Sequence, residues 1–182
     1  AEMLKAAGFA IEMGVAGMPT AFVASWGQGA PVIALLGEYD ALPGTSNRAV
    51  PYPEPAVAGG AGHACGHNLL GVAAVAAAIA VKDEMQAHGI AGTIRYYGCP
   101  AEENAGGKGY MVRAGLFKDV DATLTWHAGP INIVSLSSTL AVTQTKFQYT
   151  GRTAHAAANP EMGRSALDAV ELMNVGVNYL RE

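Results

Sequence analysis

Apolar residues occur along the chain in short runs that are separated by clusters of Gly, Pro and polar residues. Residues 32–39 (VIALLGEY) begin with a continuous apolar run, as expected of a strand that is buried on both faces of a sheet. Comparable runs predict strands over residues 20–26, 93–99 and 122–126. The intervening GQGAP at residues 27–31 has the composition of a hairpin-like turn between the first two strands.

Segments with helical composition alternate with these strands. Residues 2–13 are rich in helix formers and are followed by glycines. Residues 68–88 carry apolar residues at helical spacing with many alanines between them, which predicts one long helix that packs closely on most of its sides. Residues 106–114 predict a shorter helix. Strands that alternate with helices favour a layered α/β sheet, in which the loops at the strand ends carry the chemistry.

The remaining stretches divide the chain. Residues 43–62 are dense in Pro, Gly, Ser and Asn and predict a long loop, and loops of this length in a compact domain are usually functional or disordered. Apolar and polar residues alternate over 139–150 as in a long strand, and a further helix is predicted from about Ser165. We therefore predict one α/β domain over residues 1–137 and the first strand and helix of a smaller α+β domain over residues 138–182.

Composition and charge exclude several classes of protein. Hydrophobic residues make up 51% of the chain and charged residues 14%, which describes a globular protein with a large interior. The net charge is -4 and no stretch is markedly basic, so we expect no nucleic-acid partner. The longest apolar run, residues 69–81, is too short to span a bilayer, and no signal peptide is evident. We therefore expect a soluble, cytoplasmic protein.

The segment His63-Ala-Cys65-Gly-His67 is the first candidate for chemistry. In an extended loop, residues two apart point to the same side, so these three side chains can face one centre. Thiolate and imidazole are good zinc ligands, and Cys65 between two histidines fits a metal-binding thiolate in a reducing compartment. A free buried Cys with hydrogen-bonded histidines is the structural alternative, and a Cys–His nucleophile is the catalytic one. A nucleophilic Cys has no need of the carboxylates described next, which favours the metal site.

The pair Glu102-Glu103 follows a predicted strand and Pro100. Adjacent carboxylates point in different directions, so one can bind a metal ion while the other handles the proton of a water molecule. A solvated Glu pair on a loop is the alternative. His127 and Asp40 also follow predicted strands, and Asp40 is placed to orient a metal-bound imidazole. Because all these residues lie at the strand ends of one α/β sheet, we combine them into a single metal site.

Two residues of the second predicted domain are further candidates. His155, in the loop Arg152-Thr-Ala-His155, can donate a hydrogen bond to the carbonyl oxygen of a bound amide, which is an oxyanion role. A loop His that is satisfied locally is the alternative. Arg164 can pair with a substrate carboxylate or simply cap the helix region.

The motifs GEYDALPG, GGAGHACGHNLLG, YYGCPAEE, ATLTWHAGP and GRTAHAAANPEMGRSALDAVELM together resemble the amidohydrolase branch of the aminoacylase and glutamate-carboxypeptidase metallopeptidase superfamily. The resemblance covers nearly the whole chain, and HACGHN with CPAEE is its most specific part. Asn68 follows His67 where the branch more commonly has Asp. In this position the sequence resembles the aminobenzoyl-glutamate hydrolases, which tolerate Asn. The resemblance implies a three-layer, zinc-peptidase-like catalytic domain with a mixed, mostly parallel sheet, and a smaller lid domain that mediates dimerisation.

The same resemblance assigns roles to the candidate residues. It implies four metal ligands, namely Cys65, His67, Glu103 and His127. It makes Glu102 the general base and Asp40 a support of the metal site, whereas His63 is not expected to be a ligand. His155 matches a lid-domain His that reaches the active site of the neighbouring subunit in related dimers.

The implied function is hydrolysis of amide bonds in N-acyl amino acids such as aminobenzoyl-glutamate, with two divalent metal ions, manganese or zinc. The expected partners are a small N-acyl amino acid and a second copy in a homodimer through the lid domain, or a second related subunit. A broader N-acyl amino acid or dipeptide amidohydrolase and a non-catalytic metal-binding relative stay open as alternatives. The chain lacks an initial Met and stops inside a predicted helix, so we expect truncation at both ends, with the last His ligand of the family beyond this sequence.

Overall fold

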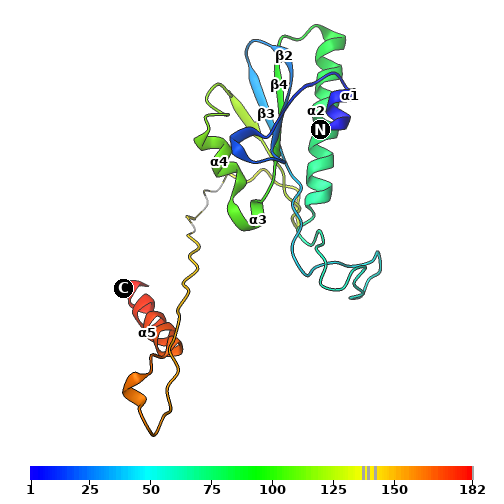
Figure 1. The fold of residues 1–182 in the computed structure, drawn as a ribbon. Helices are drawn as coiled ribbons and strands as arrows, with labels where there is room; N and C mark the ends of the chain where they lie inside the picture. Colours follow the sequence, from blue (N-terminus) through cyan, green and yellow to red (C-terminus); the bar gives the residue numbers. More distant parts are fainter. Residues whose placement is uncertain (137, 139, 142, 182) are drawn as a thin grey trace. The chain divides into compact units, whose positions relative to one another are not determined.

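The structure is a computed structural model that describes residues 1–136, 138, 140–141 and 143–181 (Figure 1). The chain divides into two compact units, Ala1–Asn132 and Ile133–Glu182, and each is described by itself. The assignment of catalytic and lid roles to the two predicted domains stays a prediction. None of the helices in the described part of the chain is long and apolar enough to cross a membrane.

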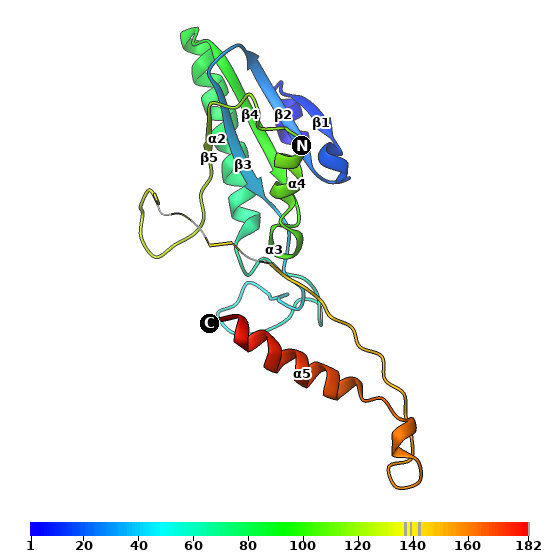
Figure 2. The same ribbon diagram turned by 90° about the vertical axis from the view of Figure 1, so that its left-hand side faces the viewer.

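The first unit is built on a five-stranded mixed sheet with the order β1-β2-β4-β3-β5, which Figure 2 shows face on. The strands are β1 (Ala10–Met13), β2 (Phe22–Gln28), β3 (Val32–Glu38), β4 (Gly92–Cys99) and β5 (Ala122–Leu124). β3 pairs in parallel with both β4 and β5, whereas β2 pairs antiparallel with both β1 and β4. Among the described strands, β2 therefore runs against the direction of all the others.

Helices cover both faces of this sheet, as Figure 1 shows. They are α1 (Glu2–Ala6), the short 3-10 helix η1 (Val15–Gly17), α2 (His67–His88), α3 (Glu102–Ala105) and α4 (Gly107–Arg113). α2 packs on β3 and β4 over one apolar cluster that contains Tyr96, and α4 and η1 cover a second cluster that contains Tyr97. Because consecutive strand residues point to opposite faces, the two tyrosines serve opposite layers. The predicted three-layer α/β fold with a mixed sheet is confirmed.

Both buried tyrosines also connect the sheet to the layer that covers it. The Tyr96 hydroxyl donates to the carbonyl oxygen of Gly71 in α2 at 3.2 Å. The Tyr97 hydroxyl donates to the carbonyl oxygen of Leu116, beyond α4, at 2.6 Å. Each buried hydroxyl therefore has an acceptor, and β4 is fixed to the layers on both of its faces.

Two local predictions in the first unit are wrong. The predicted helix over residues 2–13 stops at Ala6, and residues 10–13 form β1 instead. Gly8 adopts a positive φ of 90, which ends the helix, and pairing with β2 then outweighs the helical propensity of the sequence. The glycine-rich break after β2 is not a hairpin, because β4 lies between β2 and β3 in the sheet.

The described residues of the second unit form the 3-10 helix η2 (Pro160–Met162), the α-helix α5 (Ala166–Asn178) and the 3-10 helix η3 (Tyr179–Arg181). α5 begins where predicted, because the Ser165 hydroxyl accepts the N–H of Asp168 at 3.0 Å and caps the first turn. The predicted strand over 139–150 is not formed by its described residues, 140–141 and 143–150, while residues 139 and 142 lie outside the described set. Without a pairing ladder, an extended segment is not a strand.

Candidate metal centre

The carboxyl ends of β3 and β4 meet at one level of the sheet, where Glu38 is paired with Cys99 in the parallel register. Asp40 follows β3 by two residues, and Glu102 begins α3 directly after the loop that follows β4. α2 begins at His67 because Gly66 adopts a positive φ of 80, which turns the chain into the helix. The structure therefore brings segments that are far apart in the sequence to one edge of the sheet.

His67 is the central group of this edge, and its side chain is 1% exposed. Its Nδ1 lies 3.0 Å from Oδ1 of Asp40 and 3.1 Å from the carbonyl oxygen of the same residue. Burial acts to raise the pKa of Asp40, but the backbone N–H of Glu103, at 3.1 Å from Oδ2, and other hydrogen bonds hold it below its ordinary value. An ionised Asp40 accepts the Nδ1 proton, so the Nε2 lone pair of His67 is free to bind a cation.

Three carboxylates face this free nitrogen. Nε2 of His67 lies 3.2 Å from Oε2 of Glu38, 3.9 Å from Oε1 of Glu103 and 4.0 Å from Oε2 of Glu102. Nε2 of His67 and Oε1 of Glu103 are buried, and no described residue offers either atom a hydrogen bond of acceptable geometry. A lone pair opposite carboxylate oxygens is unfavourable unless a cation lies between them. The donor set therefore fits a divalent metal ion.

Cys65 and His127 lie at the same edge of the sheet and form a second possible ligand group with His67. Sγ of Cys65 lies 3.2 Å from Nε2 of His127, and one ligand atom each of Cys65, His67 and His127 lie within 4.8 Å of one another. A hydrogen bond with Glu103, burial and nearby carboxylate charges raise the pKa of the Cys65 thiol. A bound cation reverses this effect, because a metal ion favours the thiolate that coordinates it.

The sequence did not single out Glu38, which forms a further possible ligand group with His67 and Glu102, all within 4.8 Å. Glu38 ends the apolar β3 run and also forms an ion pair with Lys108 of α4. The available signal was a lone carboxylate at the end of an otherwise apolar strand, immediately before the Tyr-Asp segment. The structure thus places Glu38 beside the predicted residues.

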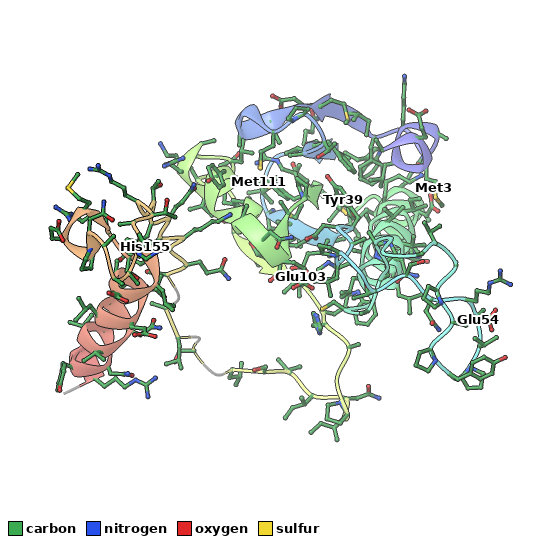
Figure 3. The ribbon with its side chains drawn as sticks, turned by 60° about the horizontal axis from the view of Figure 1, so that its bottom comes forward. Met3, Tyr39, Glu54, Glu103, Met111 and His155 are labelled. Atoms are coloured by element: carbon green, nitrogen blue, oxygen red, sulfur yellow. The ribbon has the colours of Figure 1, made fainter. Side chains whose placement is uncertain are left out.

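The long loop between Asp40 and His63 is closed at its base rather than open. Leu42 and Gly62 exchange backbone hydrogen bonds of 2.9 and 3.0 Å, and the Thr45 hydroxyl donates to both of their carbonyl oxygens. The tip, which carries Glu54, projects away from Glu103 in Figure 3. His63 is exposed at the end of this loop and belongs to neither ligand group.

His155 and Arg164 belong to the second unit. The Nδ1 of His155 accepts the backbone N–H of Ala157 at 3.2 Å and that of Ala158 at 3.1 Å, in the loop labelled in Figure 3. Nη1 of Arg164 donates to the carbonyl oxygens of Glu161 and Gly163 at 3.1 and 2.6 Å. These contacts are local to the turn before α5, and the substrate-binding role of Arg164 stays a prediction.

The comparison with known proteins assigns the class. Residues 34–179 match the Peptidase family M20/M25/M40, and the chain belongs to this family. One subunit of the p-aminobenzoyl-glutamate hydrolase of Escherichia coli (strain K12) is 54% identical over 183 residues, which cover 100% of this chain and 38% of that protein. The Xaa-Arg dipeptidase of Mus musculus is 34% identical over 175 residues, which cover 91% of this chain and 37% of that protein.

One solved structure gives the corresponding likeness in three dimensions. The Bacillus subtilis YXEP protein, described as a dinuclear metal binding peptidase from the M20 family, matches with a TM-score of 0.59 and 27% identity, over 71% of this chain and 35% of that one. The family predicted from the motifs is therefore confirmed. This chain spans less than two fifths of the length of these relatives.

Proposed function

We propose that the protein containing this chain is a metal-dependent amide hydrolase that cleaves N-acyl amino acids, such as aminobenzoyl-glutamate, into an acid and an amino acid. The observation that carries the proposal is the buried Nε2 of His67, which faces the carboxylates of Glu102 and Glu103 without a hydrogen-bond partner among the described residues. The 54% identity with a p-aminobenzoyl-glutamate hydrolase subunit supports the substrate class.

The residues proposed to hold two divalent ions are Cys65, His67, Glu103 and His127, with Asp40 orienting His67. Manganese and zinc both fit the proposal, and the thiolate favours zinc on softness. When bound, such ions lower the pKa of water and polarise the substrate carbonyl.

Glu102 is the proposed general base. Its side chain is 40% exposed, in contrast to the buried His67, and its Oε2 lies 4.0 Å from Nε2 of His67. It can therefore take a proton from the attacking water beside the ligand set and return it to the leaving amine. His155 is the proposed oxyanion donor. Because its Nδ1 accepts two backbone N–H groups, the proton of a neutral imidazole is on Nε2, which is left to donate.

An apolar pocket beside His67 supports an aromatic acyl group. The pocket has a volume of about 680 Å³, and its lining includes Phe22, Tyr39, Val72, Val75 and Tyr96. Burial raises the pKa of Tyr39 to about 12, so its hydroxyl stays protonated and donates to the carbonyl oxygen of Thr20 at 2.6 Å. Pockets of this size with aromatic walls suit small organic ligands.

The proposal extends to partners and location. We assign the second domain to homodimer formation, and the relative that is named as one subunit of a hydrolase makes a second related subunit a further partner to test. Both cysteines are free, which suits the cytoplasm, where thiols are kept reduced.

Replacing Glu102 tests the assignment of the base. The intact protein and its Glu102→Ala and Glu102→Gln variants are loaded with zinc or manganese, and aminobenzoate release and bound metal are measured together. We expect turnover to fall about 10²- to 10⁴-fold with metal retained, because proton transfer is lost. Glu54→Gln, on the exposed loop, is the matched control. Near-normal turnover of both Glu102 variants would remove Glu102 from this role.

A second candidate is a broader amidohydrolase of N-acyl amino acids or dipeptides, which the 34% identity with a Xaa-Arg dipeptidase favours. Comparing kcat/KM on aminobenzoyl-glutamate, acetyl-glutamate and a dipeptide separates the two. A protein that binds metal but hydrolyses none of these substrates would be the non-catalytic relative.

A further inference from the structure

Glu38 and Lys108 form an ion pair next to the candidate metal centre, and neither belongs to the ligand set proposed above. Glu38 is the last residue of β3, and Lys108 lies in the first turn of α4. Nζ of Lys108 donates to Oε1 of Glu38, and both side chains are largely buried, with 31% and 14% of their surfaces exposed. The pair therefore crosses from the sheet to the layer that covers it.

The two oxygens of Glu38 have different surroundings. Oε1 is bound by the Lys108 ammonium, whereas Oε2 lies 3.2 Å from Nε2 of His67. That nitrogen is buried and lacks a hydrogen-bond partner among the described residues, while the other ring nitrogen of His67 bonds Asp40. Oε2 of Glu38 and the bare nitrogen thus face each other as two electron-pair donors.

We propose that Glu38 is an additional ligand of the metal centre, and that its Oε2 shares one divalent cation with Nε2 of His67, beside the proposed general base Glu102. The inference rests on the proposed function for the presence of a metal ion, but not for the chemistry that follows. One ligand atom each of Glu38, His67 and Glu102 already lie within 4.8 Å of one another. Carboxylate oxygen and imidazole nitrogen are ligands that zinc and manganese share.

A purely structural ion pair accounts for only half of this arrangement. Lys108 satisfies Oε1, but it gives no reason for Oε2 to lie against a buried imidazole nitrogen that has no hydrogen-bond partner among the described residues. A cation between the two donor atoms removes that conflict. Lys108 then has a defined effect: its positive charge offsets part of the surplus negative charge of the carboxylates and opposes the incoming cation.

Two substitutions separate ligation from structural support. The intact protein is stripped with a chelator and titrated with Zn²⁺ and Mn²⁺ by calorimetry, and its Co²⁺ form is examined by visible absorption. The proposed centre holds two metal ions. We expect Glu38→Gln to bind the more weakly held of them about 10- to 100-fold less tightly than the unchanged protein, and to shift the absorption bands of the Co²⁺ form. Lys108→Met is expected to bind metal at least as tightly as the unchanged protein, because a repelling charge is gone.

Glu84→Gln is the matched control, because Glu84 also contacts an imidazole, that of His88 at 3.3 Å, but both groups are exposed on the surface of α2. Unfolding of each variant in excess chelator measures its structural effect without metal. If Glu38→Gln lowers only this stability and leaves metal affinity and cobalt spectrum within twofold of the control, Glu38 is not a ligand. Equal losses of affinity in Glu38→Gln and Lys108→Met would show that the ion pair, and not the carboxylate, is what the metal centre needs.

The proposed function has a separate failure. If Cys65→Ser and Glu103→Gln bind metal as tightly as the unchanged protein, the ligand set of the proposed function is wrong. If those variants lose metal while Glu38→Gln keeps it, only the role of Glu38 is wrong.

Discussion

Nδ1 of His67 lies 3.0 Å from Oδ1 of Asp40, and the other oxygen of the same carboxylate accepts the backbone N–H of Glu103 at 3.1 Å. One carboxylate therefore orients a proposed imidazole ligand and the backbone of a proposed carboxylate ligand. Carboxylates in such positions fix the tautomer of the imidazole and strengthen its binding to metal.

We predict that Asp40→Asn weakens metal binding about 10- to 100-fold, because an amide holds the Nδ1 proton less firmly than a carboxylate and releases the backbone of Glu103. Calorimetric titration of the chelator-treated protein with Zn²⁺ measures the change. Circular dichroism of the same samples reports whether the fold is retained. A folded Asp40→Asn protein with unchanged affinity would contradict the positioning role.

His155 gives a prediction about protonation rather than rate. Since two backbone N–H groups point at its Nδ1, we expect the neutral ring to carry its proton on Nε2. Nitrogen-15 NMR distinguishes the two tautomers, and comparison with the spectrum of a His155→Gln variant identifies the signals. His63, which is exposed and belongs to neither ligand group, serves as the reference ring. A dominant Nδ1–H form of His155 would argue against its role as a donor through Nε2.

The apolar pocket beside His67 predicts how the acyl group is selected. Val72→Trp places a large side chain in this pocket, so we expect KM for aminobenzoyl-glutamate to rise about tenfold or more, while acetyl-glutamate is affected less. Val81→Trp, on the same helix but outside that pocket, is the control. Equal effects of Val72→Trp on the two substrates would place the acyl group elsewhere.

The ion pair of Arg95 and Asp119 predicts a pH dependence of stability. Nη1 and Nη2 of Arg95 donate to the two carboxylate oxygens of Asp119 at 2.7 and 2.6 Å, and these bonds hold the pKa of Asp119 below its ordinary value. The stabilisation is therefore complete above the unfolded pKa, about 4, and is lost as pH falls through the lower folded value.

Urea denaturation from pH 2 to pH 7 checks this dependence. We expect the free energy difference between the unchanged protein and Asp119→Asn to be greatest above pH ~4 and to shrink below it. The same difference should decrease in high salt, because Asp119 is exposed. A difference that stays constant across this pH range would mean that the ion pair does not cause it.

Local signals explain which parts of the fold were predictable from the sequence. The long helix α2 was predicted to within one residue from its apolar residues at helical spacing, and in the structure glycines with positive φ precede and follow it at Gly66 and Gly89. β1 was not, since residues 10–13 have a helical composition and become a strand only by pairing with β2. β4 lies between β2 and β3 in the sheet although it comes much later in the sequence, and no turn motif encodes such a long-range insertion.

The candidate site shows the same limit. Cys65, His67, Glu102 and Glu103 stand in compact motifs, and a motif can be read without knowing the fold. Glu38 has no such motif, because its two partners, His67 and Lys108, come from different helices on opposite faces of the sheet. Only the three-dimensional arrangement identifies it.

The parallel register of β3 and β4 has a consequence for the accuracy of folding. Glu38 is level with Cys99, so the loops that carry Asp40 and Glu102 leave the sheet from a common line. A slip of β4 by one residue would move its end by about 3.3 Å and exchange the faces to which Tyr96 and Tyr97 point. Burial of the two tyrosines on opposite faces of β4 therefore also fixes the register of this strand. A chain in which both rings are correctly buried has Asp40 and Glu102 at their native spacing.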